Sequence, residues 1–324
     1  MKRLRSAIIA LSASAALLLP GTASALTYSP PTFDLVAKPG QVVQETLHLR
    51  NESPTPVTLT ASTANFAGKA DDDALGIPDF YPAEEVRDGR GLAPWISFPK
   101  RELTLLAGER AELAFTVAVP KNAGPGSYFG AVVLATAAGE TAENVGVTGS
   151  AAALVLLRVE GDVIENLRLN SFSAPLLSSS LPVRFEASVM NGGTVHLRPY
   201  GEVTVKNALG REVATLAMNR LEYKSVLPGM ARRYATTWQR KNVGDDASLL
   251  ARQWQNFAFG RYTAEMKLRY GQDERLMIAS TSFWVIPWLT LLILLGGVSA
   301  LFWGLRSLLR WYADRVIRRH EKGT

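Results

Sequence analysis

Short runs of apolar and β-branched residues, separated by turns, fill most of the chain between residues 26 and 283. Several runs alternate between apolar and polar side chains, as Val42 to Leu49 does, which is typical of strands with one buried face. Turn-forming groups such as Lys38-Pro39-Gly40 and Asn191-Gly192-Gly193 separate the runs. Many short strands joined in this way predict β-sandwiches. No long stretch before residue 284 has helical periodicity apart from Asp246 to Phe257.

The strand pattern divides into two series that resemble each other. In the first, the turn Leu106-Ala107-Gly108 precedes a strand, and Gly126-Ser127-Tyr128 opens the next strand. In the second, Leu227-Pro228-Gly229 and Gly260-Arg261-Tyr262 follow in the same order. A tyrosine near the start of a late strand is typical of immunoglobulin-like folds.

We therefore predict an all-β fold, with two tandem immunoglobulin-like β-sandwich domains followed by a single transmembrane α-helix. The first domain is expected over residues 26–160 and the second over residues 161–283.

Two long apolar segments lie near the ends of the chain. The first follows three basic residues and ends at Ala23-Ser24-Ala25, which predicts a cleaved signal peptide over residues 1–25. The second, residues 284–305, carries no charge and would extend about 33 Å as a helix, enough to cross a bilayer. The tail, residues 306–324, is rich in arginine and is therefore expected in the cytoplasm. These features predict a single-pass protein of the bacterial cytoplasmic membrane, with its N-terminus outside and its C-terminus inside.

The net charge of +6 belongs almost wholly to the two ends of the chain. The ectodomain is close to neutral, which argues against a nucleic-acid partner because a polyanion would find no basic field there. In the tail, apolar residues recur at helical spacing with arginines on the other face. This pattern favours a helix lying near the anionic inner leaflet, or else a stop-transfer flank with no further role.

Residues with chemical function are sparse. The chain has no cysteine, so neither disulfides nor thiolate sites are expected. His48, His196 and His320 belong to separate regions, which predicts neither a metal cluster nor a Ser/His/Asp arrangement. No phosphate-binding glycine loop is found. We therefore predict a protein that is not an enzyme, with no catalytic residue, cofactor or metal.

A 29-residue irregular stretch, Phe66 to Pro94, is the first candidate for a binding loop. It contains Phe80 and Tyr81, and Trp95 follows its end. These three aromatic side chains are the predicted contacts for a glycan or a protein, although Trp95 also fits a core position. The run Asp71-Asp72-Asp73 offers oxygen ligands for Ca²⁺, but it lacks the alternating spacing of a calcium loop and fits a solvated loop better.

The first domain resembles a known bacterial surface family. The residues that carry the resemblance are Phe33-Asp34-Leu35, Lys38-Pro39-Gly40, Leu49 to Ser53, Trp95-Ile96 and Val119 to Tyr128. This part of the chain, about residues 26–160, resembles the WxL-interacting proteins of the cell surface. The resemblance implies peptidoglycan binding by the first domain and the same order of signal peptide, two immunoglobulin-like domains, membrane helix and basic tail.

Three hypotheses for the function follow. The first is a non-enzymatic, membrane-anchored adhesin or scaffold that binds cell-wall glycan (peptidoglycan) or a surface partner protein. The second is an accessory or chaperone-like component of a surface assembly or secretion machine, which an unpaired edge strand would favour. The third is a signal-relaying membrane protein whose tail contacts a cytoplasmic partner.

Overall fold

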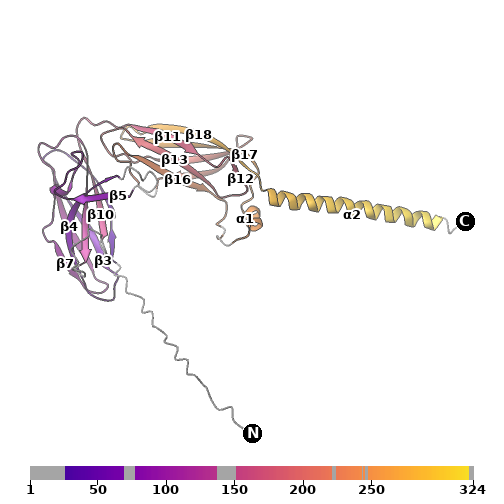
Figure 1. Cartoon of the computed structure of the whole chain (residues 1–324), viewed down its shortest axis with the longest axis horizontal. Helices are drawn as coiled ribbons and strands as arrows, with labels where there is room; N and C mark the ends of the chain where they lie inside the picture. Colours follow the sequence, from indigo (N-terminus) through magenta and orange to yellow (C-terminus); the bar gives the residue numbers. More distant parts are fainter. Residues whose placement is uncertain are drawn as a thin grey trace, which may run out of the picture.

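The computed structural model describes residues 26–68, 77–136, 151–220, 224–242, 244 and 247–320, with residues 313–320 described for the backbone alone. The expected signal peptide, residues 1–25, and the acidic run Asp71-Asp72-Asp73 lie outside the described residues. Two β-sandwich domains and a long C-terminal helix make up the described part (Figure 1).

The first domain packs two sheets against each other. One sheet has the order β1 (Leu26–Ser29), β3 (Val42–Asn51), β8 (Arg110–Ala118) and β6 (Ile96–Ser97). The other has the order β2 (Thr32–Ala37), β10 (Ala151–Val159), β9 (Gly126–Thr136), β4 (Val57–Gly68) and β5 (Pro78–Pro82), and β7 (Glu102–Leu105) also pairs with β4. Alternate residues of the facing strands, such as Leu47, Phe115 and Val155, form the core.

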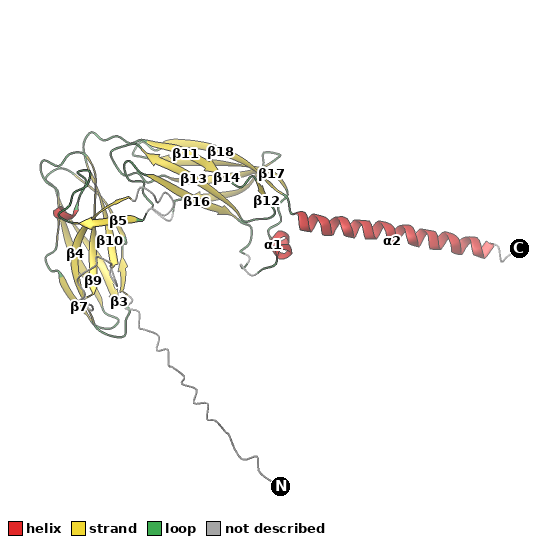
Figure 2. Cartoon of the chain, in the orientation of Figure 1, coloured by secondary structure: helices red, strands yellow, loops and turns green. Residues whose placement is uncertain are grey.

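The second domain repeats this plan and continues into the helix. One sheet has the order β11 (Leu167–Ser173), β13 (Val183–Asn191) and β16 (Ala231–Trp238). The other sheet has the order β12 (Leu177–Ser178), β18 (Arg275–Val285), β17 (Gly260–Tyr270), β14 (Tyr200–Asn207) and β15 (Glu212–Met218). A short helix, α1 (Leu249–Gln255), lies between β16 and β17 (Figure 2). Trp238, Tyr262 and Phe283 pack edge to face or stacked at the centre of the core.

In each domain the first two strands join opposite sheets of the sandwich. β1 pairs antiparallel with β3, and β2 then pairs parallel with β10. In the second domain β11 pairs antiparallel with β13, and β12 then pairs parallel with β18. The prediction of two tandem immunoglobulin-like sandwiches is therefore confirmed. The expected tyrosines also match, because the hydroxyl of Tyr128 donates to the carbonyl of Gly124 (3.0 Å) and that of Tyr262 to Phe259 (3.3 Å).

A buried asparagine closes the same corner in each domain. Asn191, at the end of β13, donates from Nδ2 to the carbonyls of Val195 (2.8 Å) and Val226 (2.9 Å). Asn51, at the end of β3, donates in the same way to three carbonyls, those of Thr55, Leu105 and Leu106. Each asparagine therefore ties the end of its strand to the turn that precedes the partner strand, β16 or β8.

The stretch from Phe66 to Pro94 is more ordered than the sequence predicted. β4 continues through Phe66 to Gly68, and β5 pairs back onto it. The fully buried side chain of Asn65 holds the following segment: its Nδ2 donates to the carbonyls of Ala83 (3.1 Å) and Glu85 (2.7 Å), and its Oδ1 accepts from the N–H of Ala93 (2.8 Å). The side chain of Asn65 thus holds the segment between β5 and the short helix that follows, and this segment also joins the sheet through a bridge between Gly91 and Phe129.

The last strand leads into the helix with only two residues between them. β18 extends through Val285, which pairs with Gly260, and α2 (Trp288–His320) begins after Pro287. Trp284, where the sequence predicted the helix to start, is therefore still part of the sheet. One stretch of α2, Trp288–Tyr312, is long and apolar enough to cross a membrane, and almost none of it is buried against the protein.

Candidate functional site: the angle between the domains

The two domains are joined at an angle by buried polar contacts. The Oγ of Ser127, at the start of β9, lies 2.7 Å from Nδ1 of His196, in the segment between β13 and β14. The Nε2 of His196 lies 2.9 Å from Oδ1 of Asp34, on β2. Because Asp34 can only accept, the neutral imidazole carries its proton on Nε2 and accepts from the hydroxyl of Ser127 on Nδ1. The contact therefore links three residues that the sequence places far apart.

The backbone of the second domain takes part in the same contact between Asp34, Ser127 and His196, which we call the interdomain joint. The carbonyl of Thr194 accepts from the N–H of Ser127 (3.1 Å) and from Nη1 of Arg90 (2.9 Å). The N–H of His196 donates to Oγ of Ser127 (2.9 Å). Polar groups buried at this contact are therefore paired, as a stable interface requires.

The carboxylate of Asp34 responds to this arrangement. Burial would raise the pKa of Asp34, but the hydrogen bond from His196 and the positive charges of Arg198 and Arg158 outweigh it. The resulting pKa lies below the ordinary value of an aspartate. Asp34 is therefore ionised at neutral pH and favours the joined state of the domains.

A row of aromatic rings leads from the joint to the solvent. Phe129 contacts His196 with the ring centroids 6.0 Å apart, Phe66 follows at 5.6 Å, and Phe80 on β5 follows at 6.2 Å. Phe66 and Phe129 are buried together with Leu156, and Leu227 of the second domain packs against them. Phe80 is 42% exposed. The row therefore connects an exposed aromatic side chain to the interdomain contact.

A second ion pair crosses the linker. Nη1 of Arg158, on β10, lies 2.6 Å from Oε1 of Glu165, and both side chains are largely buried. The other carboxylate oxygen of Glu165 accepts from the N–H of Gln272 (2.9 Å), and its backbone carbonyl accepts from Arg275 (2.8 Å). Glu165 thus connects the last strand of the first domain to the β17–β18 turn of the second.

Two edge strands border the angle. β5 pairs only with β4, and β16 pairs only with β13, in the part of the chain that the structure describes. Figure 1 shows β5 on the side of the first domain that faces the second, and β16 along the side of the second domain that faces the angle. Pro78 and Pro82 lie at the two ends of β5, where they remove N–H donors. β16 has eight residues and no proline, and so offers the longer free edge.

The structure separates the three aromatic residues that the sequence singled out. Phe80, on β5, is partly exposed and packs against Phe66. Tyr81, the next residue of β5, is buried and lies under the guanidinium of Arg87 at 4.4 Å. Trp95 ends the short helix η1 (Ala93–Trp95) and packs against the ring of Tyr128 at 4.4 Å. That these residues contact a ligand stays a prediction, and Phe80 is the most exposed of the three.

The prediction that the chain has no Ser/His/Asp arrangement was wrong. Asp34, Ser127 and His196 have the hydrogen-bonding order of a hydrolase triad. These three residues lie far apart in the sequence, and they come together only because the two domains pack against each other. However, Ser127 is 1% exposed and its Oγ also accepts from the N–H of His196. No substrate can reach this hydroxyl unless the domains separate, so in the described state the three residues form an interdomain contact.

Comparisons with known proteins do not assign this chain to a family. No protein-family model and no curated protein sequence matches the chain. Among solved structures, it is similar to the class 5 fimbriae chaperone CfaA (14% identity, TM-score 0.37), over 79% of this chain and 99% of that one. It is also similar to the CsuC–CsuE chaperone–tip subunit complex of Acinetobacter baumannii (9% identity, TM-score 0.36), over 79% of this chain and 98% of that one. A third similar structure is a protein of unknown function from Porphyromonas gingivalis (16% identity, TM-score 0.28), over 80% of this chain and 99% of that one. These values carry no conclusion about the function of this chain.

Proposed function

We propose that this chain is a membrane-anchored accessory component of surface-protein assembly, which holds a partner protein in the angle between its two domains. The observation that carries this proposal is the angle itself: buried ion pairs and hydrogen bonds fix it, and two edge strands and the exposed ring of Phe80 border it. A fixed angle bordered by a free strand edge suits a partner that contributes an extended segment.

The partner's mode of binding follows from the two strands. An extended segment added to the edge of β16 would gain main-chain hydrogen bonds there. Its apolar side chains could then contact Phe80 across the angle. This arrangement requires no chemistry, so the proposed function is not enzymatic.

The membrane anchor is part of the proposal. Trp288–Tyr312 would span the bilayer, and the arginines that follow Leu305 favour a cytoplasmic C-terminus. The two sandwich domains would then lie on the outer side of a bacterial cytoplasmic membrane, next to proteins passing to the surface. This position matches a role in handling exported subunits.

A photo-crosslinking experiment tests the proposal. A photoreactive phenylalanine analogue is placed at Phe80 in the full-length chain in cells of the source organism, and at the exposed Leu106 as the matched control. We expect a covalent adduct with an exported protein from position 80 and none from position 106. Equal adducts from both positions, or none from either, would contradict a partner site in the angle.

Peptidoglycan binding, as the resemblance to WxL-interacting proteins implies, has a separate candidate location. A shallow hollow on the outer face of the first domain is lined by Tyr28, His48, Arg50, Arg110 and Glu112, among others. Aromatic and charged side chains of this kind suit a sugar with ionised groups. Sedimentation of the purified chain with cell-wall sacculi tests this alternative, and loss of sedimentation in Arg50→Ala, but not in Phe80→Ser, would assign the binding to the hollow.

A further inference from the structure

The end of the second domain nearest to α2 is formed by four segments that are separate in the sequence. Strand register places them together: Val285 pairs with Gly260, and Leu177 pairs with Trp284. Asn207, at the end of β14, pairs with Tyr262, near the start of β17. The β14–β15 turn, the β12 segment, the α1 region and the start of α2 therefore share one end of the domain.

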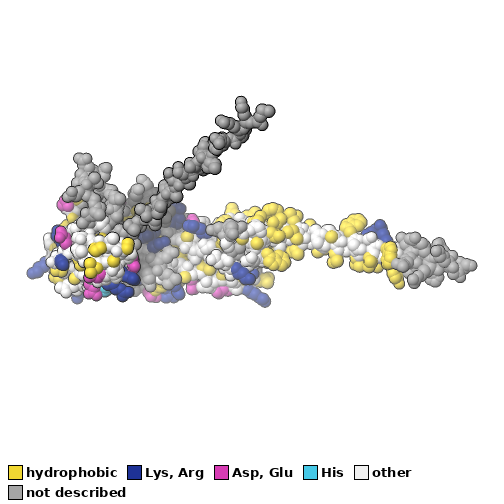
Figure 3. Space-filling model, turned by 90° about the horizontal axis from the view of Figure 1, so that it is seen from below, with side chains coloured by type: hydrophobic (Ala, Val, Ile, Leu, Met, Phe, Trp, Pro, Cys, Tyr) yellow, Lys and Arg dark blue, Asp and Glu magenta, His cyan; other side chains and the backbone are white. Residues whose placement is uncertain are grey.

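These four segments expose large apolar side chains at that end. The exposed residues are Leu176, Leu177, Leu209, Trp254, Phe257, Phe259, Trp284, Ile286 and Trp288. Leu209 is 79% exposed and Trp254 is 69% exposed. Figure 3 shows apolar side chains gathered where the second domain meets the helix. Contiguous apolar surface of this kind usually marks a contact with a membrane or another protein.

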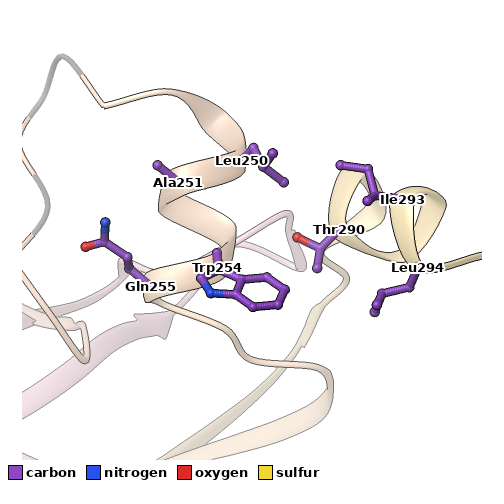
Figure 4. A pocket seen from close by; sticks show the side chains of 7 residues that line it. All are labelled: Leu250, Ala251, Trp254, Gln255, Thr290, Ile293 and Leu294. Atoms are coloured by element: carbon purple, nitrogen blue, oxygen red, sulfur yellow. The ribbon is translucent and has the colours of Figure 1, made fainter. Parts of the chain in front are cut away.

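Helix α1 is fastened to the beginning of α2. Gln253 of α1 is fully buried, and its Oε1 accepts from the N–H of Thr290 (3.0 Å) and from the hydroxyl of Thr290 (3.1 Å). The first N–H groups of a helix have no partner within the helix, so Gln253 satisfies one of them from a distant segment. Figure 4 shows the side chains that line the hollow between the two helices, among them Leu250 and Trp254 of α1 and Ile293 and Leu294 of α2. The exposed face of α1 therefore keeps a fixed position beside α2.

We propose that this end of the second domain is a lipid-binding foot, formed by the nine residues listed above, which enters the interfacial region of the outer leaflet beside α2. The inference rests on the membrane anchoring that the proposed function includes. Lipid is the occupant that the structure favours, because the foot is continuous with the start of the apolar helix. Tryptophan and phenylalanine beside a spanning helix are suited to this depth of a bilayer.

Basic side chains at the same end of the domain suit the phosphate groups of a phospholipid. Arg211, Arg240, Lys241 and Arg261 are exposed and belong to the segments that form the foot. Glu212, next to the β14–β15 turn, opposes them. An apolar surface with a basic rim suits acyl chains below and phosphate groups around it.

The absence of cysteine from the chain permits a direct test by site-specific spin labelling. Single cysteines are introduced as Trp254→Cys and Leu209→Cys in the foot, and the full chain is reconstituted in vesicles of phosphatidylcholine and phosphatidylglycerol. Leu276→Cys is the matched control, because Leu276 is 53% exposed and lies on β18 about 26 Å before Trp284. Leu301→Cys, within α2, reports the bilayer interior.

We expect nitroxides at positions 254 and 209 to be accessible to oxygen and protected from a water-soluble nickel chelate. These accessibilities should correspond to about 5–10 Å below the headgroups. The nitroxide at position 276 should be accessible to the chelate, as in water, and that at position 301 should lie deep in the bilayer.

Two results would overturn the foot while leaving the anchor intact. In the first, positions 254 and 209 match position 276 while position 301 is deep. In the second, positions 254 and 209 are protected from both reagents, which indicates a second protein surface as the occupant. Exposure of position 301 to the chelate would instead refute the membrane anchor, and the foot with it.

Discussion

Replacing His196 with alanine should loosen the angle between the two domains. His196 is the only histidine of the described residues that bridges the domains, with one ring nitrogen on Ser127 and the other on Asp34. The substitution removes both hydrogen bonds and the ring that packs against Phe129. It leaves the hydroxyl of Ser127 buried without an acceptor for its proton.

The expected loss can be worked out from the two contacts. A buried hydrogen bond such as that from Ser127 contributes about 0.5–1.5 kcal/mol, and one to a charged group contributes about 1.5–3 kcal/mol. The side chain of Asp34 is 41% exposed, so solvent screening reduces the second value to about 1 kcal/mol. We therefore expect the free energy that holds the domains together to fall by about 1.5–2.5 kcal/mol.

Pulsed spin–spin distance measurements report the angle directly. Labels at Leu106→Cys and Leu209→Cys lie at the ends of the two domains that are remote from the joint, so that a small change in angle produces a large change in distance. The native chain should give one narrow distance distribution, and His196→Ala a broad one. His48→Ala is the matched control, because His48 also faces a carboxylate, that of Glu112 at 3.5 Å, but on the exposed surface.

The pH dependence gives a second measurement on the same labelled chain. Because the pKa of Asp34 is lowered in the folded state, its contribution is complete above the ordinary aspartate value of about 3.9 and is lost as the pH falls further. The narrow distribution should therefore broaden below about pH 4, and Asp34→Asn should already be broad at pH 7. A narrow distribution for His196→Ala at pH 7 would refute the reasoning and assign the angle to the remaining contacts, those of Glu165, of the Thr194 carbonyl and of the apolar cluster.

Three further predictions concern stability, each measured as the free energy of unfolding of the full chain in detergent. Arg158→Ala leaves the largely buried carboxylate of Glu165 without its guanidinium and should cost about 3 kcal/mol, whereas Arg184→Ala, in an exposed pair with Glu186, should cost less than about 1 kcal/mol. Equal costs would contradict the importance of burial. Asn191→Ala removes the buried hydrogen bonds to the carbonyls of Val195 and Val226 and should cost about 2–4 kcal/mol, against less than about 1 kcal/mol for Asn207→Ala at the half-buried end of β14. Gly193→Ala should destabilise the second domain, because a Cβ there would collide with the backbone oxygen of Ile164. Gly210→Ala is the matched control, because a Cβ at Gly210 meets open space and the only cost is the positive φ of that residue. A smaller cost for Gly193→Ala than for Gly210→Ala would refute the close approach.

The sequence predicted the sandwiches because their strands have strong local signals. The turns at Leu106-Ala107-Gly108 and Leu227-Pro228-Gly229 precede β8 and β16 as expected, and Asp246 to Phe257 contains α1. Alternation, turn residues and helical periodicity are properties of neighbouring residues, so they can be read without the fold. The corner asparagines were also visible, since Asn51 and Asn191 each end a strand, but their shared role requires the tertiary hydrogen bonds.

The interdomain joint could not be predicted from the sequence. His196 and Asp34 lie 162 residues apart, and neither has a sequence neighbour that marks it as part of a contact. The segment from Phe66 to Pro94 was misjudged for a similar reason, because part of it is held by hydrogen bonds of the Asn65 side chain, which leave no periodic pattern in the sequence. Phe80 was selected as an aromatic residue on a long loop, but the angle that β5 borders depends on the packing of a domain encoded elsewhere in the chain.

The joint and the foot together restrict where the first domain can lie relative to the membrane. β18 is joined to α2 by two residues, and the hydrogen bonds that Thr290 donates to Gln253 fix α1 against the same helix. If the foot also rests in the bilayer, the second domain has little freedom to tilt, and the contacts of His196 and Glu165 transfer this orientation to the first domain. A segment held in the angle would then have a defined height and direction above the membrane. A flexible tether would only keep a partner near the membrane. The fixed contact between the domains and the fixed contact between the second domain and the membrane therefore favour a role in positioning a partner over one in simple capture.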